Sequence, residues 1–185
     1  ARIFCHRNAC VVALSDVSGG IYCESGLDAD AVSAFLEEGH LLKDYQAEGV
    51  SHISNAELLT CDCDVLVPAA LENQINAEVA EQLRCKYIVE GANGPTTVEA
   101  DAILEQRGIT LIPDIFANSG GVIVSYFEWV QNIQELTWER SQVNEMLEKL
   151  MTASFGELLE ERKKTACSYR MAAYIVALRR LLYAE

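Results

Sequence analysis

The 185-residue sequence carries 28 acidic and 14 basic residues, which give a formal net charge of −14, and 50% of its residues are apolar. Such an excess of carboxylates repels nucleic-acid phosphates, so we expect no nucleic-acid partner. No apolar run is long enough to cross a bilayer, and the first ten residues lack the hydrophobic region of a signal peptide. We therefore expect no membrane partner and a cytoplasmic protein.

The cysteines favour reduced thiols over a disulfide framework, because there are seven of them at irregular spacings. Cys61 and Cys63 form a C-x-C pair, but no second pair of Cys or His residues with zinc spacing accompanies them. We therefore predict no metal site.

Short apolar runs alternate with helical patterns between residues 10 and 114. Strands are expected at 10–16, 63–70, 86–95 and 109–114, and helices at 27–39, 76–85 and 96–108. Asp28 is expected to cap the first of these helices. The alternation predicts an α/β fold in which one parallel sheet is covered by helices.

After residue 117 the pattern is helical only, with helices expected at 119–135, 140–163 and 168–184. In the last of these, an apolar stripe is expected to face the core, and it consists of Met171, Ile175, Leu178 and Leu182. The change of pattern predicts an α/β domain at 1–118 and a helical segment at 119–185 that packs on it.

Ligands of open parallel sheets bind beyond the carboxyl ends of the strands. The segments there are built of small or polar residues, and they are 16–20, 68–70, 90–96 and 114–121. The last segment leads into a helix through Gly120 and Gly121, where another group can approach the backbone closely and the free N–H groups attract an anion.

Asp16 closes the run at 10–16 and has two interpretations. An acid at the end of the second strand of a dinucleotide fold accepts hydrogen bonds from the adenosine ribose and repels a 2′-phosphate. Alternatively, "SDVSGG" is a tight turn in which Asp16 satisfies backbone N–H groups. The pattern alone does not separate the two.

Four stretches resemble the C-terminal half of the glutamate dehydrogenases, within the glutamate, leucine, phenylalanine and valine dehydrogenase superfamily. They are "VVALSDVSGGIY", "DVLVPAALENQI", "VEGANGPTTVEAD" and "PDIFANSGGVIVSYFEWVQN". The resemblance runs from about residue 8 to 183 and implies a Rossmann-like sheet followed by helices. It further implies reversible oxidative deamination of L-glutamate to 2-oxoglutarate, a small-molecule substrate, with NAD as cofactor and NADP as the alternative, in a homo-oligomer.

The resemblance also implies roles for individual residues. Those assigned to the cofactor are Asp16, with Ser15 and Ser18 beside it near the ribose, Pro68, Ala69 and Ala70 along its length, and Asn93 and Asn118 at its nicotinamide end. Val122 lines the pocket for the substrate side chain, and Ser125 binds the side-chain carboxylate. A serine within a helix also commonly bonds back to its own helix, which is the alternative for Ser125.

The sequence departs from the family in what precedes these motifs. It contains neither the glycine-rich lysine motif and catalytic aspartate of a substrate domain, nor the first strand and Gly-x-Gly-x-x-Gly turn of the nucleotide fold. We therefore expect an incomplete sheet in a fragment that is inactive alone, and we assign no catalytic residue. The alternatives are a non-catalytic nucleotide-binding regulatory module, or an assembly module formed by the helices after residue 119.

Overall fold

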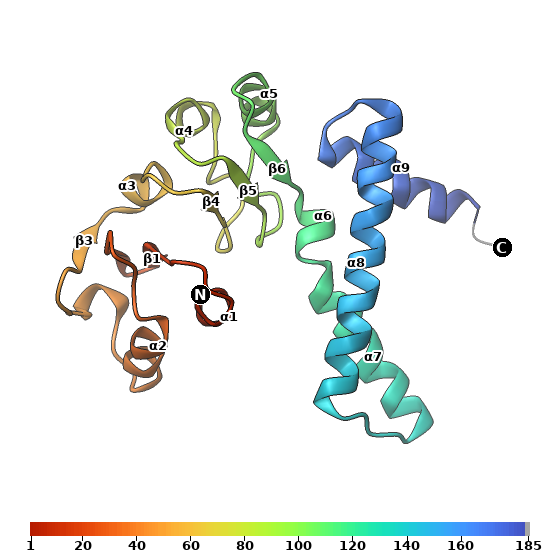
Figure 1. Ribbon diagram of the computed structural model, residues 1–185, viewed down its shortest axis with the longest axis horizontal. Coiled ribbons are helices and arrows are strands. Elements are labelled where there is room, and N and C mark those ends of the chain that lie inside the picture. Colours follow the sequence, from red (N-terminus) through yellow and green to blue (C-terminus); the bar gives the residue numbers. More distant parts are fainter. Residues whose placement is uncertain (184–185) are drawn as a thin grey trace. The chain divides into compact units, whose positions relative to one another are not determined.

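Residues 1–183 are described by a computed structural model, in which the chain forms two compact units (Figure 1). The first unit consists of Ala1–Asp64 and Glu78–Cys85, and the second of Val65–Ala77 and Lys86–Glu185. The last helix of the chain packs on strand β6 within the second unit, and the boundary expected at residue 118 stays a prediction. The ends predicted for that helix, at 184, and for its segment, at 185, lie outside the described residues.

The first unit combines a small sheet with short helices. Its elements are α1 (Arg2–His6), β1 (Ala13–Asp16), β2 (Gly19–Tyr22), α2 (Ala29–Glu37), the 3₁₀ turn η1 (Leu42–Asp44), β3 (Ser51–Ile53), α3 (Asn55–Leu59) and most of α4 (Ala77–Gln82). Asp28 caps α2 as expected, since its carboxylate accepts hydrogen bonds from the N–H groups of Asp30 and Ala31.

The strand predicted at 10–16 does not join a parallel sheet with the later strands, so this part of the prediction is wrong. It forms β1, which pairs antiparallel with β2, and β2 pairs antiparallel with β3. The cause is a two-residue turn that closes a hairpin directly after Asp16, where Asp16 pairs with Gly19. Gly19 has a φ of +148°, which favours glycine. The two glycines at the start of β2 hid this strand from the sequence prediction, because glycine weakens the strand pattern.

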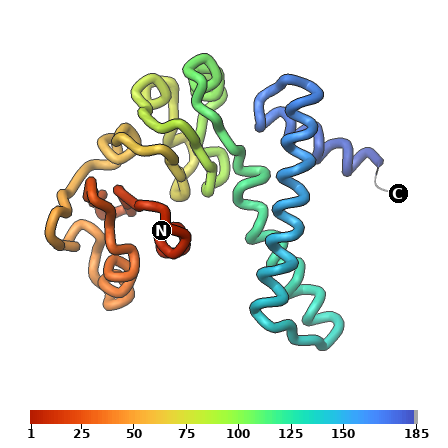
Figure 2. The backbone as a smooth tube through the Cα atoms, viewed as in Figure 1, coloured from red at the N-terminus to blue at the C-terminus, as the bar shows by residue number. Residues whose placement is uncertain are grey.

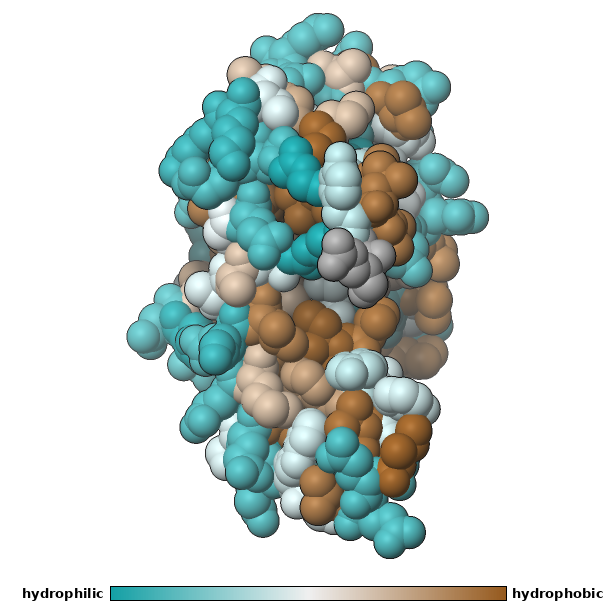
Figure 3. Space-filling view, turned by 90° about the vertical axis from the view of Figure 1, so that its right-hand side faces the viewer, coloured by the Kyte–Doolittle hydropathy of each residue, from teal (hydrophilic) through white to brown (hydrophobic). Residues whose placement is uncertain are grey.

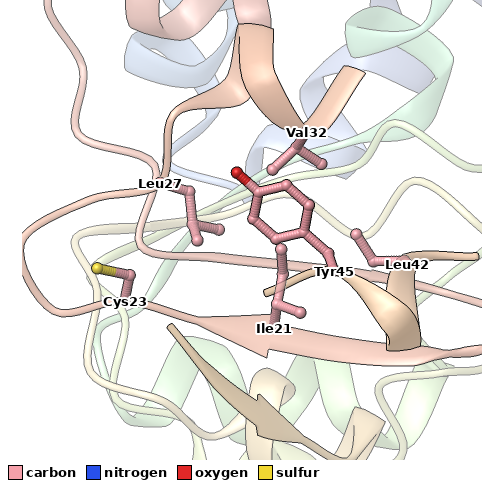
Figure 4. Packing of buried hydrophobic residues seen from close by; sticks show 6 residues of the cluster. All are labelled: Ile21, Cys23, Leu27, Val32, Leu42 and Tyr45. Atoms are coloured by element: carbon pink, nitrogen blue, oxygen red, sulfur yellow. The ribbon is translucent and has the colours of Figure 1, made fainter. Parts of the chain in front are cut away.

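A cluster of apolar side chains forms the core of the first unit around the ring of Tyr45 (Figure 4). Its members are Ile21, Cys23, Leu27, Val32, Leu42 and Tyr45. They come from β2, α2, η1 and the segments beside them, so the hairpin and the helix are held together by burial of apolar surface.

The second unit contains a three-stranded parallel sheet in the order β4-β5-β6 (Val65–Leu66, Tyr87–Val89 and Thr110–Ile112). These strands confirm the predictions at 63–70, 86–95 and 109–114, although each is shorter. Helix α5 (Val98–Gln106) crosses from β5 to β6, and Thr97 caps it by accepting a hydrogen bond from the N–H of Ala100. Ile88 of β5 and Leu104 of α5 are fully buried. The coarse prediction of an α/β protein with a small parallel sheet is therefore confirmed.

Four helices complete the second unit: α6 (Asp114–Ala117), α7 (Ser119–Gln134), α8 (Arg140–Thr165) and α9 (Tyr169–Leu182). The chain passes from β6 through the short α6 into α7 (Figure 2). The three long helices confirm the predictions at 119–135 and 140–163 and most of the one at 168–184. Ser168 caps α9, since its hydroxyl accepts a hydrogen bond from the N–H of Met171.

The face of α9 that packs on α8 differs from the predicted stripe. Met171, Leu178 and Leu182 are exposed, whereas Ala172 and Ala173 are buried beside Leu158 of α8. Two adjacent alanines let the helices approach closely, and this packing turns the larger apolar side chains outward. Figure 3, a view from the side where α8 and α9 are drawn, shows apolar residues gathered on the surface.

Candidate functional site

A groove of about 780 Å³ lies within the second unit, where segments that follow β4, β5 and β6 meet. Its lining residues are Ala70, Leu71, Glu72, Gly91, Ala92, Asn93, Asn118, Gly121, Val122 and Ser125. The groove thus brings together five residues that the sequence assigned to cofactor or substrate, namely Ala70, Asn93, Asn118, Val122 and Ser125. The carboxyl ends of parallel strands meet at one edge of a sheet, which is why segments so far apart in sequence converge.

The turn after β4 is held against the turn after β5. The carbonyl oxygen of Pro68 accepts hydrogen bonds from the N–H groups of Gly91 (3.0 Å) and Ala92 (2.9 Å). Pro68 is buried, whereas Ala69 and Ala70 are exposed. The backbone of this turn is therefore held in place, and its last residue, Ala70, lines the groove, whereas Pro68 and Ala69 do not.

Asn93 and Asn118 lie next to each other in the lining of the groove. The side-chain nitrogen of Asn118 donates a hydrogen bond to the side-chain oxygen of Asn93 at 2.7 Å. Among the described residues neither side-chain amide has another partner, so the pair still offers the NH2 group of Asn93 as a donor and the side-chain oxygen of Asn118 as an acceptor, besides the second N–H of Asn118. Either orientation of the two amides leaves the same two functions. The groove can therefore hydrogen-bond a primary carboxamide, which has an acceptor oxygen and an NH2 donor group of its own.

Helix α7 contributes Val122 and Ser125 to the same groove. Val122 is 74% exposed and Ser125 is also exposed. Within residues 1–183 the Ser125 hydroxyl makes no hydrogen bond to its own helix or to another group. This hydroxyl can therefore donate to a ligand, and the alternative in which it bonds back to α7 is not what the structure contains.

Asp16, Ser15 and Ser18 lie in the first unit, in the β1–β2 hairpin. The carboxylate of Asp16 accepts hydrogen bonds from the backbone N–H (2.7 Å) and the hydroxyl (2.6 Å) of Ser18. Burial opposes ionisation of Asp16, but these bonds and the nearby N–H groups of Gly19 and Leu42 outweigh it and hold its pKa below the ordinary value. Asp16 thus closes the turn, as the second interpretation of "SDVSGG" has it, and remains an anion.

A buried charge network that the sequence analysis missed lies beneath the groove. Arg170 of α9 binds Glu90, Asp101 and Asp114, and Glu90 is fully buried. Burial opposes the charge on the guanidinium, but the hydrogen bonds and charges of Glu90 and Asp101 outweigh this effect and raise the pKa of Arg170 above its ordinary value. The available signal was an arginine in the apolar run "RMAAYIVAL" and a glutamate directly after the apolar strand "YIV".

A second cavity, of about 460 Å³, lies between α8 and α9 and is lined by charged side chains. Its charges pair with one another, since Arg179 binds Glu161 and Arg180 binds Glu157, each at 2.7 Å. It therefore offers a ligand less than the groove, where the Asn93 and Asn118 amides keep unused donor and acceptor groups beside the bond between them.

Cys61 and Cys63 are partly buried free thiols. Burial raises the pKa of both, and for Cys63 burial together with Cys61 and Cys85 raises it to about 12. Within residues 1–183, no group of three His, Cys, Asp or Glu side chains is placed to hold a metal ion. No helix in this part of the chain combines the length and apolar character needed to span a membrane.

These features define an α/β protein with a ligand groove at the carboxyl edge of a parallel sheet. A family model described as Glutamate/Leucine/Phenylalanine/Valine dehydrogenase matches residues 1–185. The chain therefore belongs to the glutamate, leucine, phenylalanine and valine dehydrogenase family.

Individual relatives agree with this assignment. The chain is 48% identical over 174 residues to a glutamate dehydrogenase of Thermotoga maritima, which covers 94% of this chain and 41% of that protein. It is 44% identical over 183 residues to an NADP-specific glutamate dehydrogenase of Halobacterium salinarum. This match covers 98% of this chain and 44% of that protein. The crystal structure of the hetero-hexameric glutamate dehydrogenase from Thermus thermophilus, in its leucine-bound form, matches with a TM-score of 0.86 and 30% identity, over 97% of this chain and 42% of that one. The chain thus spans about two fifths of the length of these relatives.

Proposed function

We propose that this chain is the nicotinamide-nucleotide-binding part of a glutamate dehydrogenase. The observation that carries the proposal is the groove in which Asn93, Asn118 and Ser125 present hydrogen-bonding groups that no other described residue uses. The position of the groove beyond three parallel strands supports a Rossmann-like nucleotide fold. The reaction is the reversible conversion of L-glutamate, water and oxidised dinucleotide to 2-oxoglutarate, ammonium, reduced dinucleotide and a proton.

The residues present fit a nicotinamide. Its carboxamide carries an acceptor oxygen and an NH2 donor group, which are complementary to the unused NH2 group of Asn93 and the unused side-chain oxygen of Asn118. The dinucleotide supplies the hydride chemistry when bound, and the protein supplies orientation. We propose that Asn93 and Asn118 hold the nicotinamide end and that the turn of Pro68, Ala69 and Ala70, of which Ala70 lines the groove, passes along the dinucleotide. No residue of this chain is assigned as acid or base.

The cofactor we propose is NAD. Asp16 is an anion whose pKa is lowered, and a carboxylate near the adenosine ribose repels the 2′-phosphate of NADP. Ser15 and Ser18 flank it on the same hairpin. The H. salinarum relative is NADP-specific, so the two dinucleotides are to be titrated separately. An equal Kd for both would refute the role of Asp16.

The substrate pocket we propose is formed by Val122 and Ser125 on α7. The Ser125 hydroxyl donates a charge-assisted hydrogen bond to the side-chain carboxylate of glutamate, and Val122 contacts its methylene groups. A site built for that bond rejects amino acids that lack the carboxylate.

The test is Ser125→Ala in the complete gene product, with Ser154→Ala on α8 as a helical control outside the groove. Loss of a hydrogen bond to a charged group costs about 1.5–3 kcal/mol, so kcat/KM for glutamate should fall by about tenfold to a hundredfold. Ser154→Ala should leave it unchanged. A Ser125→Ala enzyme with the kcat/KM of the wild type would refute the assignment.

We also propose that the gene product is a homo-oligomer. The support is the apolar surface that α9 leaves exposed, which includes Tyr174, Leu178 and Leu181. Sedimentation equilibrium of the gene product tests this, and a monomer at micromolar concentration would refute it.

A further inference from the structure

Arg170 uses all three guanidinium nitrogens. Its Nε donates to Asp101 at 2.5 Å, its Nη1 donates to Glu90 at 2.9 Å and lies 3.4 Å from Asp114, and its Nη2 donates to Glu90 at 2.8 Å and to Asp101 at 3.2 Å. Its side chain is 20% exposed, and that of Glu90 is 0% exposed. A planar, forked cation thus joins α9 to α5, α6 and Glu90, the residue that follows β5, in a fixed geometry.

One of the carboxylate residues bound by Arg170, Asp114, is hydrogen-bonded to backbone groups at the groove. Glu90 also accepts a hydrogen bond from the N–H of Asp114 at 2.8 Å, and Asp114 accepts one from the N–H of Gly94 at 2.8 Å. Gly94 is the neighbour of Asn93 in the chain. On the other side, the N–H of Asn118 donates to the carbonyl oxygen of Asp114 at 3.1 Å. Both members of the asparagine pair are therefore tied to Asp114.

The network has an excess of negative charge, because three carboxylates surround one guanidinium. Without that cation the carboxylates of Glu90 and Asp114 would repel each other, and the Glu90 carboxylate would be buried without its counter-charge. The turn at Gly94 and the start of α6 would then shift, since both are bonded to these two carboxylates.

We propose that Arg170 is a positioning residue that sets the separation and orientation of Asn93 and Asn118 in the groove. Through them it orients the nicotinamide end of the dinucleotide, although it lines no part of the groove itself. This inference rests on the proposed function.

The test compares NAD with ADP-ribose, which lacks the nicotinamide, in the complete gene product. Arg170→Lys keeps the charge but not the forked donors, so the Kd for NAD should rise about five- to tenfold, as for one lost hydrogen bond, while the Kd for ADP-ribose stays within about twofold. A role in stability alone would change neither Kd, or both by the same factor. Arg179→Gln, which removes a partner of Glu161 on the same helix, is the control and should leave the ratio of the two Kd values unchanged.

A second variant covers a failure of Arg170→Lys to fold. Asp101→Asn weakens the hydrogen bond from Arg170 Nε at the more exposed side of the network and leaves Glu90 paired. It should therefore raise the ratio of the Kd for NAD to the Kd for ADP-ribose by a smaller factor than Arg170→Lys does. An unchanged ratio in the folded variants, or an equal shift in Arg179→Gln, would overturn the inference. A wild-type gene product that does not reduce NAD with glutamate would refute the proposed function instead.

Discussion

Gly91 occupies a position where a side chain has no room. A Cβ atom added there would lie 3.0 Å from the Cβ and 3.4 Å from the Cα of Ala69, and 3.6 Å from the carbonyl oxygen of Pro68. The hydrogen bond from the Gly91 N–H to Pro68, at 3.0 Å, holds the two turns together at this distance. Gly91→Ala should therefore push the Pro68–Ala70 turn away from the end of β5.

Two opposing effects set the size of the change. Carbon atoms prefer a separation of about 3.5–4.0 Å, so the two turns must part by a few tenths of an ångström, and overpacking of this kind costs about 1–3 kcal/mol. The φ of Gly91 is not positive, so alanine fits the backbone and gains about 0.4–1 kcal/mol by restricting the unfolded chain. The strain is larger, and we expect the free energy of unfolding to fall by about 1 kcal/mol.

Urea denaturation followed by tryptophan fluorescence measures this change, because the chain's two tryptophans, Trp129 and Trp138, both lie in the second unit. The matched control is Gly156→Ala in α8, where an added Cβ meets nothing within 4 Å. That substitution should stabilise the protein by about 0.8–1 kcal/mol through helix propensity alone. If Gly91→Ala is as stable as the wild type, or stabilised like the control, the steric argument is wrong.

Two further predictions concern a thiol and a helix end. Burial beside Cys61 and Cys85 raises the pKa of Cys63 to about 12, so this thiol stays protonated below that pH. Its alkylation by iodoacetamide should therefore remain slow between pH 7 and about 10, while the exposed Cys10 reacts. Peptide mass spectrometry measures both rates, and rapid alkylation of Cys63 at pH 8 in the folded protein would contradict this prediction. Ala166 ends α8 with a φ of 51°, where a Cβ is unfavourable, so Ala166→Gly should raise the free energy of unfolding by about 1 kcal/mol in the same urea assay, and a lower value would argue against strain at that residue.

The local order of elements could be predicted from the sequence. The strands at 63–70, 86–95 and 109–114 and the three long helices follow from apolar periodicity, and Asp28 from capping preference. The site segments at 68–70, 90–96 and 114–121 followed from a rule that needs only the ends of parallel strands, whereas the segment at 16–20 follows an antiparallel strand. Asn93, Asn118 and Ser125 do share one groove in the second unit, whereas the roles given to them remain proposals.

Pairing and burial were decided by the tertiary structure. The run at 10–16 has the apolar character of a buried parallel strand, but a hairpin turn gave it the nearest partner in the chain. The apolar residues on α9 form a stripe in sequence, yet two alanines pack on α8 because small side chains allow the closest approach. The ion pair between Arg170 and Glu90 joins residues 80 positions apart, and nothing local in either segment indicates the other. Periodicity and capping act within a few residues and are readable in sequence, whereas the partner of a strand, a helix face or a buried charge depends on which distant surfaces fit together once the chain has folded.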